Sequence, residues 1–267
     1  MKKISILGAG WLGMPLAIAL KEKGHSLKVS TTTPDKVALF EPHDIPCYVV
    51  ELGTTKGIVD LDTFLSDTDV LIVTIPPKIT KISPYAYAER INFILWNLEK
   101  HHIKEVIFTS SISVYHGLEG EVDETTPLHT ITPRSKQMAQ ADHLFLNADN
   151  CKATVLRLGG LMGEDRNPLL SLSKKRVIEA GNKPVNLVHQ EDIIRFITKI
   201  LEEPIKNEVF NVVAPIGLSR KDFYTKEAQR LGIKDLPEFI LSPETENRLV
   251  NGAKITKAFG LDYTRLV

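Results

Sequence analysis

Three glycines near the N-terminus are spaced in a way that suits the binding of phosphate. They follow a short apolar run and precede leucines at helical spacing, so they form the turn between a strand and a helix. In such a turn the first glycine permits a tight bend, the second lets a pyrophosphate approach the backbone, and the third lets the helix pack close to the strand. The N–H groups at the helix start then face the phosphates. This context predicts a nicotinamide dinucleotide site rather than a plain turn, with contacts from Gly8, Gly10, Trp11, Leu12 and Gly13.

The end of the second predicted strand decides between the two forms of this cofactor. An acidic residue there would accept hydrogen bonds from the ribose hydroxyls and repel a 2′-phosphate. This chain instead has Thr31, Thr32 and Thr33, with Lys36 shortly after, while Asp35 follows a proline and is expected to lie past the ribose. We therefore predict NADP in preference to NAD. The alternative is that the threonines simply belong to the strand and its turn.

Two further strand ends are expected beside the adenosine half of the cofactor. The third predicted strand ends near Glu51, whose carboxylate can accept a hydrogen bond from the adenine amino group. The fourth is a continuous apolar, β-branched run that fits a strand covered on both faces, and two prolines close it. We expect further cofactor contacts from Glu51, Ile75, Pro76 and Pro77.

Strands alternate with helices along most of the chain. Apolar runs predict strands over 4–7, 27–31, 45–52, 70–75, 106–109, 153–158 and 209–213, and apolar residues at helical spacing mark helices over 91–98, 137–146, 193–201 and 220–231. This alternation predicts an α/β protein: an NAD(P)-binding Rossmann fold with a doubly wound parallel sheet and a small mixed C-terminal lobe. We expect a dinucleotide-binding core over 1–158 and a substrate-side lobe over 159–267, interleaved with the last core elements at 185–202.

Composition excludes several classes of function. The 267 residues carry 33 Lys plus Arg and 33 Asp plus Glu, and this neutral balance argues against a dedicated nucleic-acid binder. The two cysteines indicate no disulfide framework and fit a reducing compartment. No stretch has the character of a signal peptide or membrane span, and no Cys/His cluster has metal-ligand spacing. We expect a cytoplasmic protein that acts on a small-molecule substrate, with no metal and no nucleic-acid or membrane partner.

A serine at the end of the fifth predicted strand is the first candidate for chemistry on a substrate. Ligands of open α/β sheets bind at the carboxyl ends of the strands, where Ser111 is expected. Its hydroxyl can hold a substrate oxygen, although a serine at a strand end can also simply bond to the backbone. Tyr115 is the nearest phenol in sequence and His116 and His129 are titratable neighbours, each with the alternative of a packed aromatic or a surface histidine.

The stretch 108–115 resembles the serine-rich strand end of the extended short-chain dehydrogenase/reductases, the NAD-dependent epimerase/dehydratase proteins that act largely on nucleotide sugars. Other segments match that family in the same order, so the resemblance covers nearly the whole chain: 87–92, 122–127, 155–163, 186–193 and 247–254. It implies an NAD(P)-dependent epimerase, dehydratase or reductase of the atypical short-chain class, acting on a nucleotide sugar or another small carbonyl or hydroxyl compound. It also implies a homodimer formed through the long helices expected at 87–98 and 133–146.

The family's catalytic group is incomplete in this chain. The family uses a Ser or Thr to polarise the substrate oxygen, a Tyr as acid or base, and a Lys four residues later that lowers the tyrosine pKa and hydrogen-bonds the nicotinamide ribose. By motif, Ser111 and Lys136 match two of these residues, but Thr132 stands at the tyrosine position. A threonine hydroxyl cannot replace a phenol as an acid near neutral pH, and none of the six tyrosines has a Lys four residues on. Thr132 before Pro133 is also typical of a helix N-cap.

Three hypotheses follow. The first is an enzyme in which Ser111 holds the substrate oxygen, Lys136 contacts the cofactor and Tyr115 is the substitute acid to test first. The second is an NADP-binding sensor or regulatory protein that lost catalysis together with the tyrosine. The third comes from residues 13–17, which also look like the β-hydroxyacid dehydrogenases. We rank it last, because those proteins continue with an all-helical domain whereas strand-like runs follow here.

Overall fold

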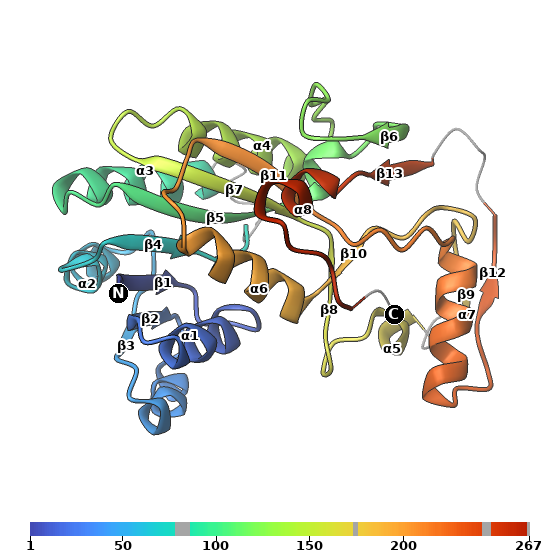
Figure 1. The fold of residues 1–267 in the computed structure, drawn as a ribbon, viewed down its shortest axis with the longest axis horizontal. Coiled ribbons are helices and arrows are strands. Elements are labelled where there is room, and N and C mark those ends of the chain that lie inside the picture. Colours follow the sequence, from blue (N-terminus) through green and yellow to red (C-terminus); the bar gives the residue numbers. More distant parts are fainter. Residues whose placement is uncertain (78–85, 173–175, 242–246, 266–267) are drawn as a thin grey trace.

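A sheet of seven parallel strands runs through the centre of the molecule (Figure 1). The computed structural model describes residues 1–77, 86–172, 176–241 and 247–265. The strand order is β11-β7-β5-β4-β1-β2-β3. The strands are β1 (Lys3–Leu7), β2 (Ser26–Thr31), β3 (Cys47–Val49), β4 (Val70–Val73), β5 (Glu105–Ser111), β7 (Lys152–Leu158) and β11 (Glu208–Val212). Every neighbouring pair is parallel, so the predicted doubly wound Rossmann sheet is confirmed.

The direction of strand addition reverses beside β1. Strands β2 and β3 are added on one side of β1, and β4 then begins the other half of the sheet on the opposite side. Open α/β sheets bind ligands in the crevice beyond the carboxyl ends of the strands at such a point. The register pairs Ile4 with Val70 and Leu7 with Val73, so β1 and β4 end level with one another. The glycine turn, which starts at Gly8, therefore begins at the reversal point.

Helices cover both faces of the sheet because its strands bury side chains in both directions. In β4, Val70 and Ile72 pack on one face, and Leu71 and Val73 pack on the other, as the two-residue period of a strand requires. The first face carries α1 (Gly13–Glu22), α6 (Gln190–Leu201) and α8 (Ala253–Phe259), and the second carries α2 (Thr55–Leu65), α3 (Ala86–Lys100) and α4 (Pro133–Leu146). The doubly covered strand predicted from the continuous apolar run is confirmed.

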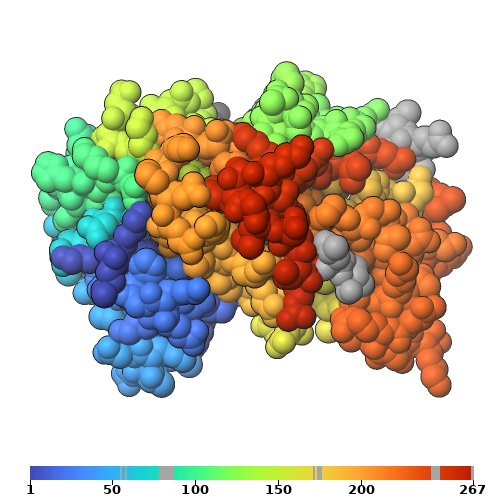
Figure 2. Space-filling model, in the orientation of Figure 1, coloured from blue at the N-terminus to red at the C-terminus, as the bar shows by residue number. Residues whose placement is uncertain are grey.

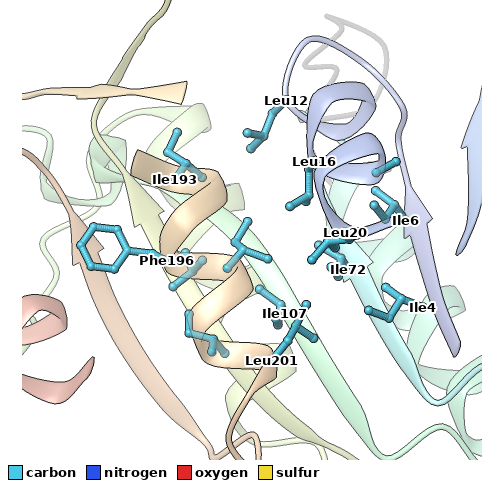
Figure 3. Close-up of a cluster of buried hydrophobic side chains, with 14 of the residues drawn as sticks. Ile4, Ile6, Leu12, Leu16, Leu20, Ile72, Ile107, Ile193, Phe196 and Leu201 are labelled. Atoms are coloured by element: carbon cyan, nitrogen blue, oxygen red, sulfur yellow. The ribbon is translucent and has the colours of Figure 1, made fainter. Parts of the chain in front are cut away.

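The core between α1 and α6 fixes the helix that starts at the glycine turn. Figure 3 shows side chains of α1, its N-cap and α6 gathered over the strands: Leu12, Leu16, Leu20, Ile193 and Leu201 over Ile4, Ile6, Ile72 and Ile107, while Phe196 points to the side of α6 away from α1. Leu16 and Leu20 are fully buried, and the burial of such side chains stabilises the fold by roughly 1.5–3 kcal/mol each. The position of α1 is therefore set by apolar packing.

The small mixed lobe lies beyond one end of the sheet, where α7 forms its outer side (Figures 1 and 2). It is built from α5 (Pro168–Leu172), α7 (Arg220–Leu231) and two two-stranded parallel pairs: β8 (Gly160–Met162) with β10 (Leu187–His189), and β9 (Val177–Ile178) with β12 (Glu238–Phe239). A third parallel pair, β6 (Gly120–Val122) with β13 (Arg248–Val250), joins the core on the second face of the sheet through Val122 and Val250. A separate apolar cluster around Leu169, Phe223 and Tyr224 supports the lobe. The domain boundaries and the pairing of two copies through α3 and α4 stay predictions.

Two predicted strands are shorter than expected, and several helices were not predicted, among them α2, α5 and two 3₁₀ helices. The third strand covers Cys47–Val49 of the predicted 45–52, because it starts only after Pro46, which lacks an N–H group. The fourth ends at Val73. The 3₁₀ helices are η1 (Pro34–His43) and η2 (Ile112–Tyr115). Among the described residues, no helix combines the length and apolar character needed to cross a membrane.

Substitution of Gly13 tests how closely α1 approaches the end of β1. A Cβ at Gly13 would clash with the carbonyl oxygen of Gly8, whereas a Cβ at Gly10 would meet nothing within 4 Å. We expect Gly13→Ala to lower the free energy of unfolding by about 1–3 kcal/mol, the usual cost of overpacking. Urea denaturation measures this change, with Gly10→Ala as the control that stays within about 0.5 kcal/mol of the unaltered chain. Equal stability of the two variants would contradict the tight approach.

Candidate cofactor and substrate cleft

The glycine turn is held on two sides by neighbouring strand ends. Gly8 has a φ of 111°, a left-handed conformation that favours glycine, and its N–H donates to Ser30 Oγ at 3.1 Å. The Thr74 hydroxyl donates to the carbonyl oxygen of Gly8 at 2.6 Å. Ala9 N–H donates to the carbonyl oxygen of Ser30 at 2.6 Å. The ends of β2 and β4 therefore fix the shape of the turn.

The start of α1 offers backbone donors to an anion. Its N-cap position is Leu12, and no side chain caps the helix there. The first N–H groups of a helix have no partner within the helix and carry partial positive charge. Gly10 keeps the space beside them open. This donor set fits the pyrophosphate of a dinucleotide, which the backbone from Gly10 to Gly13 would hold.

A cavity of about 270 Å³, cavity A, lies on one side of the turn. Its lining includes Gly8, Gly10, Thr31, Thr32, Thr33, Lys36, Glu51, Ile75, Pro76 and Arg90. The predicted contacts to the adenosine half thus meet in one place, apart from Pro77. Thr32 and Thr33 are exposed, while Thr31 Oγ1 is occupied by the N–H of Thr33 at 3.1 Å. Arg90 comes from α3, and nothing local in the sequence pointed to it.

A second cavity of about 770 Å³, cavity B, continues from cavity A past the turn. The two share Gly8, Gly10, Thr74, Ile75 and Pro76, so they adjoin at the glycine turn, and together they are called the cleft. Cavity B also takes in the remaining predicted turn contacts and the end of β5: Trp11, Leu12, Gly13, Pro77, Thr109, Ser110 and Ser111. The cleft therefore joins the cofactor turn to the predicted substrate serine.

Ser111 lies at the end of β5 and lines cavity B. Its Oγ accepts a hydrogen bond from the N–H of Ser113 at 3.2 Å, so the backbone bond of the alternative interpretation is present. That bond uses a lone pair, and a serine hydroxyl keeps its O–H for donation. The arrangement leaves Ser111 able to donate to a substrate oxygen in the cavity.

Tyr115 lies away from the cleft. Its side chain is fully buried in the core and does not line cavity B. Its hydroxyl donates to Asn211 Oδ1 at 3.0 Å and accepts from Arg157 Nη1 at 2.7 Å, and Arg157 Nε donates to Asp142 Oδ2 at 2.8 Å. Burial raises the pKa of Tyr115, although the neighbouring Arg157 opposes the rise. The structure thus does not bring the predicted substitute acid together with Ser111, and the phenol belongs to a buried polar network.

The face of α4 that lines cavity B carries Arg134 and Met138, whereas Lys136 is exposed and does not line it. Two residues along a helix turn the side chain by about 200°, so a residue between these two points away from their face. The structure therefore does not place Lys136 in the cavity where its contact with the cofactor was expected. Thr132 is the N-cap of α4, accepting from the N–H of Ser135 at 3.1 Å, so the N-cap interpretation of this threonine is confirmed.

Three arginines give cavity B a positive charge. Arg134, Arg166 and Arg248 line it, and no carboxylate does so among its described lining residues. Arg248 Nη1 donates to the carbonyl oxygen of Tyr115 at 2.6 Å, while its buried Nε has no partner among the described residues. Burial lowers the pKa of Arg248. None of these three arginines was predicted as a site residue, although Arg248 lies inside the segment 247–254 that carries part of the resemblance. An anionic ligand suits this cavity.

The sheet and its cleft define an NAD(P)-binding Rossmann protein. The chain belongs to the NAD(P)H-binding family, whose model matches residues 8–204. It is 33% identical to Protein YeeZ of Escherichia coli K12 over 266 residues, which cover 98% of this chain and 96% of that protein.

Solved structures show the same fold. The UDP-glucose 4-epimerase of Thermotoga maritima, solved with UDP-glucose, matches with a TM-score of 0.81 at 17% identity. The match covers 98% of this chain and 94% of the epimerase chain. The UDP-glucuronic acid 4-epimerase of Bacillus cereus, solved with NAD, matches with a TM-score of 0.80 at 20% identity. That match covers 99% of this chain and 94% of the epimerase chain. The predicted resemblance to the epimerase-like short-chain proteins is confirmed. Strands β5, β7 and β11 stand where the third hypothesis required helices.

A pair of variants on α4 tests which of its faces meets the cofactor. We expect Arg134→Gln to weaken NADPH binding by about two- to tenfold, the effect of one net hydrogen bond, because Arg134 lines the cleft. Lys136→Gln removes a positive charge two residues away and should leave binding unchanged, since Lys136 is exposed outside the cleft. Isothermal titration calorimetry measures the NADPH affinity of both variants. Loss of affinity in Lys136→Gln alone would contradict the orientation of α4 given by the structure.

Proposed function

We propose that the chain is an NADP-dependent oxidoreductase or epimerase that acts on a small anionic compound with a carbonyl or secondary hydroxyl group, a class that includes nucleotide sugars. One observation carries the proposal: cavity B is lined both by Gly10 of the glycine turn and by Ser111. The bound nicotinamide would supply hydride exchange with a substrate carbon. The residues of this chain bind, orient and move protons around that exchange.

The adenosine half of the cofactor is proposed to lie in cavity A with its 2′-phosphate beside Lys36. Lys36 and Arg90 supply two cations there, and Glu51 is the carboxylate among the described lining residues. Thr32 and Thr33 add exposed hydroxyl groups close to Lys36. A doubly charged phosphate is favoured by charge-assisted hydrogen bonds from such groups. This combination supports NADP over NAD.

The substrate is proposed to bind in cavity B with its anionic group towards Arg248. The guanidinium is fixed by its bond to the carbonyl oxygen of Tyr115. Its buried Nε has no partner in the part of the chain that the structure describes, which favours a ligand that accepts from it. Ser111 would donate to the reacting oxygen at the other side of the cavity. Binding at these two points orients the substrate carbon towards the cofactor.

His116 is the proposed proton carrier in place of the missing tyrosine. It lines cavity B, and it is the one residue among the described lining residues whose side-chain type exchanges a proton near neutral pH. It would accept the hydroxyl proton when a substrate is oxidised and return a proton when a carbonyl is reduced. The charged groups that line the adjoining hollow with it are Glu119, Lys183, Arg220 and Arg248.

Turnover by the unaltered chain tests the function. The panel contains nucleotide sugars and small hydroxy and oxo compounds, each with NADP⁺ or NADPH. The absorbance of the reduced nicotinamide reports net oxidation or reduction, and chromatography of the sugar products reports epimerisation, which leaves the cofactor unchanged. We expect Ser111→Ala to lower kcat/KM by about 100-fold, as for loss of one donor to the reacting oxygen, with unchanged cofactor affinity. His116→Gln should lower kcat/KM in both directions, because it removes the proposed proton carrier. Full activity in Ser111→Ala would contradict the proposal.

Cofactor choice is tested separately at Lys36. We expect Lys36→Gln to weaken NADPH binding by about tenfold, the effect of losing a hydrogen bond to a charged group, and to leave NADH binding unchanged. The matched control is Lys136→Gln, which removes a lysine outside the cleft. Calorimetric titration of each variant with both cofactors gives the ratio of its NADPH affinity to its NADH affinity. Equal loss for NADPH and NADH would show that Lys36 does not contact the 2′-phosphate.

A second candidate function is an NADP-binding sensor without catalysis. The buried position of Tyr115 favours it, because among the described residues no tyrosine lines cavity B. It predicts tight cofactor binding by a chain that turns over none of the panel compounds. Turnover that is lost in Ser111→Ala would exclude it.

A further inference from the structure

Trp11 ties the glycine turn to a loop that follows β8, residues 163–166. Its indole Nε1–H donates to Asp165 Oδ1 at 2.7 Å. A Cβ placed on Gly163 would lie 2.8 Å from the Trp11 ring, so the ring packs directly on that glycine. The Gln190 side chain donates to the carbonyl oxygen of Trp11 at 2.6 Å. Core and lobe therefore meet at the turn that binds phosphate.

The loop is a tight turn that fixes Arg166. Gly163 N–H donates to the carbonyl oxygen of Arg166 at 3.0 Å, and Arg166 N–H donates back to Gly163 at 3.1 Å. The Arg166 guanidinium carbon lies 5.0 Å from the centroid of the Trp11 ring, within the range of a cation–π contact. Among the described residues, no carboxylate forms an ion pair with Arg166. Its cation is thus held in place by an aromatic platform and is available to an anion.

Trp11 separates two hollows of opposite character. On one side lies a hollow of about 510 Å³ whose lining carries Glu164, Asp165 and Glu191 together with Lys36. On the other lies cavity B, where Arg166 shares the lining with the glycine turn and no carboxylate appears among the described residues. Trp11 lines both. An anion beside the turn is therefore favoured on the side of Arg166.

We propose that Arg166 is a second pyrophosphate ligand, which binds the phosphates of the dinucleotide from the lobe side, opposite the backbone N–H groups of the glycine turn, with Trp11 as its platform. This inference rests on the cofactor site of the proposed function. It makes the loop 163–166 part of the cofactor site, so the lobe contributes to cofactor affinity as well as to the substrate pocket. Arginine suits the role because its planar fork can stack on an aromatic ring while donating to phosphate.

Binding measurements test the inference without any turnover. Three probes are titrated by calorimetry: NADP⁺, adenosine 2′-monophosphate, which fills only the adenosine half in cavity A, and UDP, which offers the diphosphate of a nucleotide substrate. We expect Arg166→Gln to weaken NADP⁺ binding by about tenfold or more, the effect of a lost charge-assisted hydrogen bond, and to leave the other two probes unchanged. Arg166→Lys keeps the charge without the planar fork, so its NADP⁺ affinity should lie between those of the unaltered chain and Arg166→Gln. The control is Arg176→Gln, an exposed arginine that lines neither cavity.

Trp11 itself supplies a second readout. The chain has two tryptophans, and Trp96 is 56% exposed on α3, so Trp96→Phe leaves Trp11 as the single emitter. We expect NADP⁺ to change its emission and adenosine 2′-monophosphate to leave it unchanged. The change should be much smaller after Arg166→Gln at equal saturation.

The outcomes separate this inference from the function on which it rests. Unchanged NADP⁺ affinity in Arg166→Gln, while the unaltered chain binds NADP⁺, would overturn the inference alone. Weakened UDP binding with unchanged NADP⁺ binding would assign Arg166 to the substrate and also overturn it. Failure of the unaltered chain to bind either NADP⁺ or adenosine 2′-monophosphate would contradict the cofactor site and the inference together.

Discussion

The close approach of α1 to the end of β1 determines the geometry of the whole cleft. Gly13 allows the helix to start against the carbonyl oxygen of Gly8, and Leu16 and Leu20 hold the helix there by burial against the sheet. As a result, an uncapped helix N-terminus stands at the point where the strand order reverses. Cavities A and B open on either side of that point. The position of the helix N-terminus therefore sets where the cofactor phosphates would lie relative to both cavities.

The second constraint is electrostatic, and it concerns the phenol nearest in sequence to Ser111. Tyr115 is held behind Ser111 by Arg157, whose own charge is balanced by the buried Asp142. Loss of one member of such a pair is strongly destabilising, which favours a structural role for this tyrosine. The positive charge in the cleft comes instead from arginines on α4, the lobe loop and β13. Among the described lining residues of cavity B, the charged groups are therefore cations, and no phenol is present.

Local patterns were sufficient to predict most of the fold. Apolar runs and helical spacing gave the strands of the sheet, and the hydroxyl of Thr132 before a proline gave the start of α4. The face that α4 turns to the cleft depends on its packing against α3 and β7, which the sequence does not state, so Lys136 was expected where Arg134 lies. Arg166 and Arg248 come from distant segments brought together by the fold. Only tertiary structure shows that they share a cavity with the glycine turn.

A crystal structure of the chain with NADP⁺ tests the central claim most directly. The account predicts that the pyrophosphate lies at the backbone of Gly10 to Gly13, the 2′-phosphate lies beside Lys36 in cavity A, and the nicotinamide lies in cavity B beside Ser111 with no tyrosine hydroxyl at its reactive carbon. A nicotinamide bound outside cavity B, or a dinucleotide bound in the reverse direction along the cleft, would contradict it.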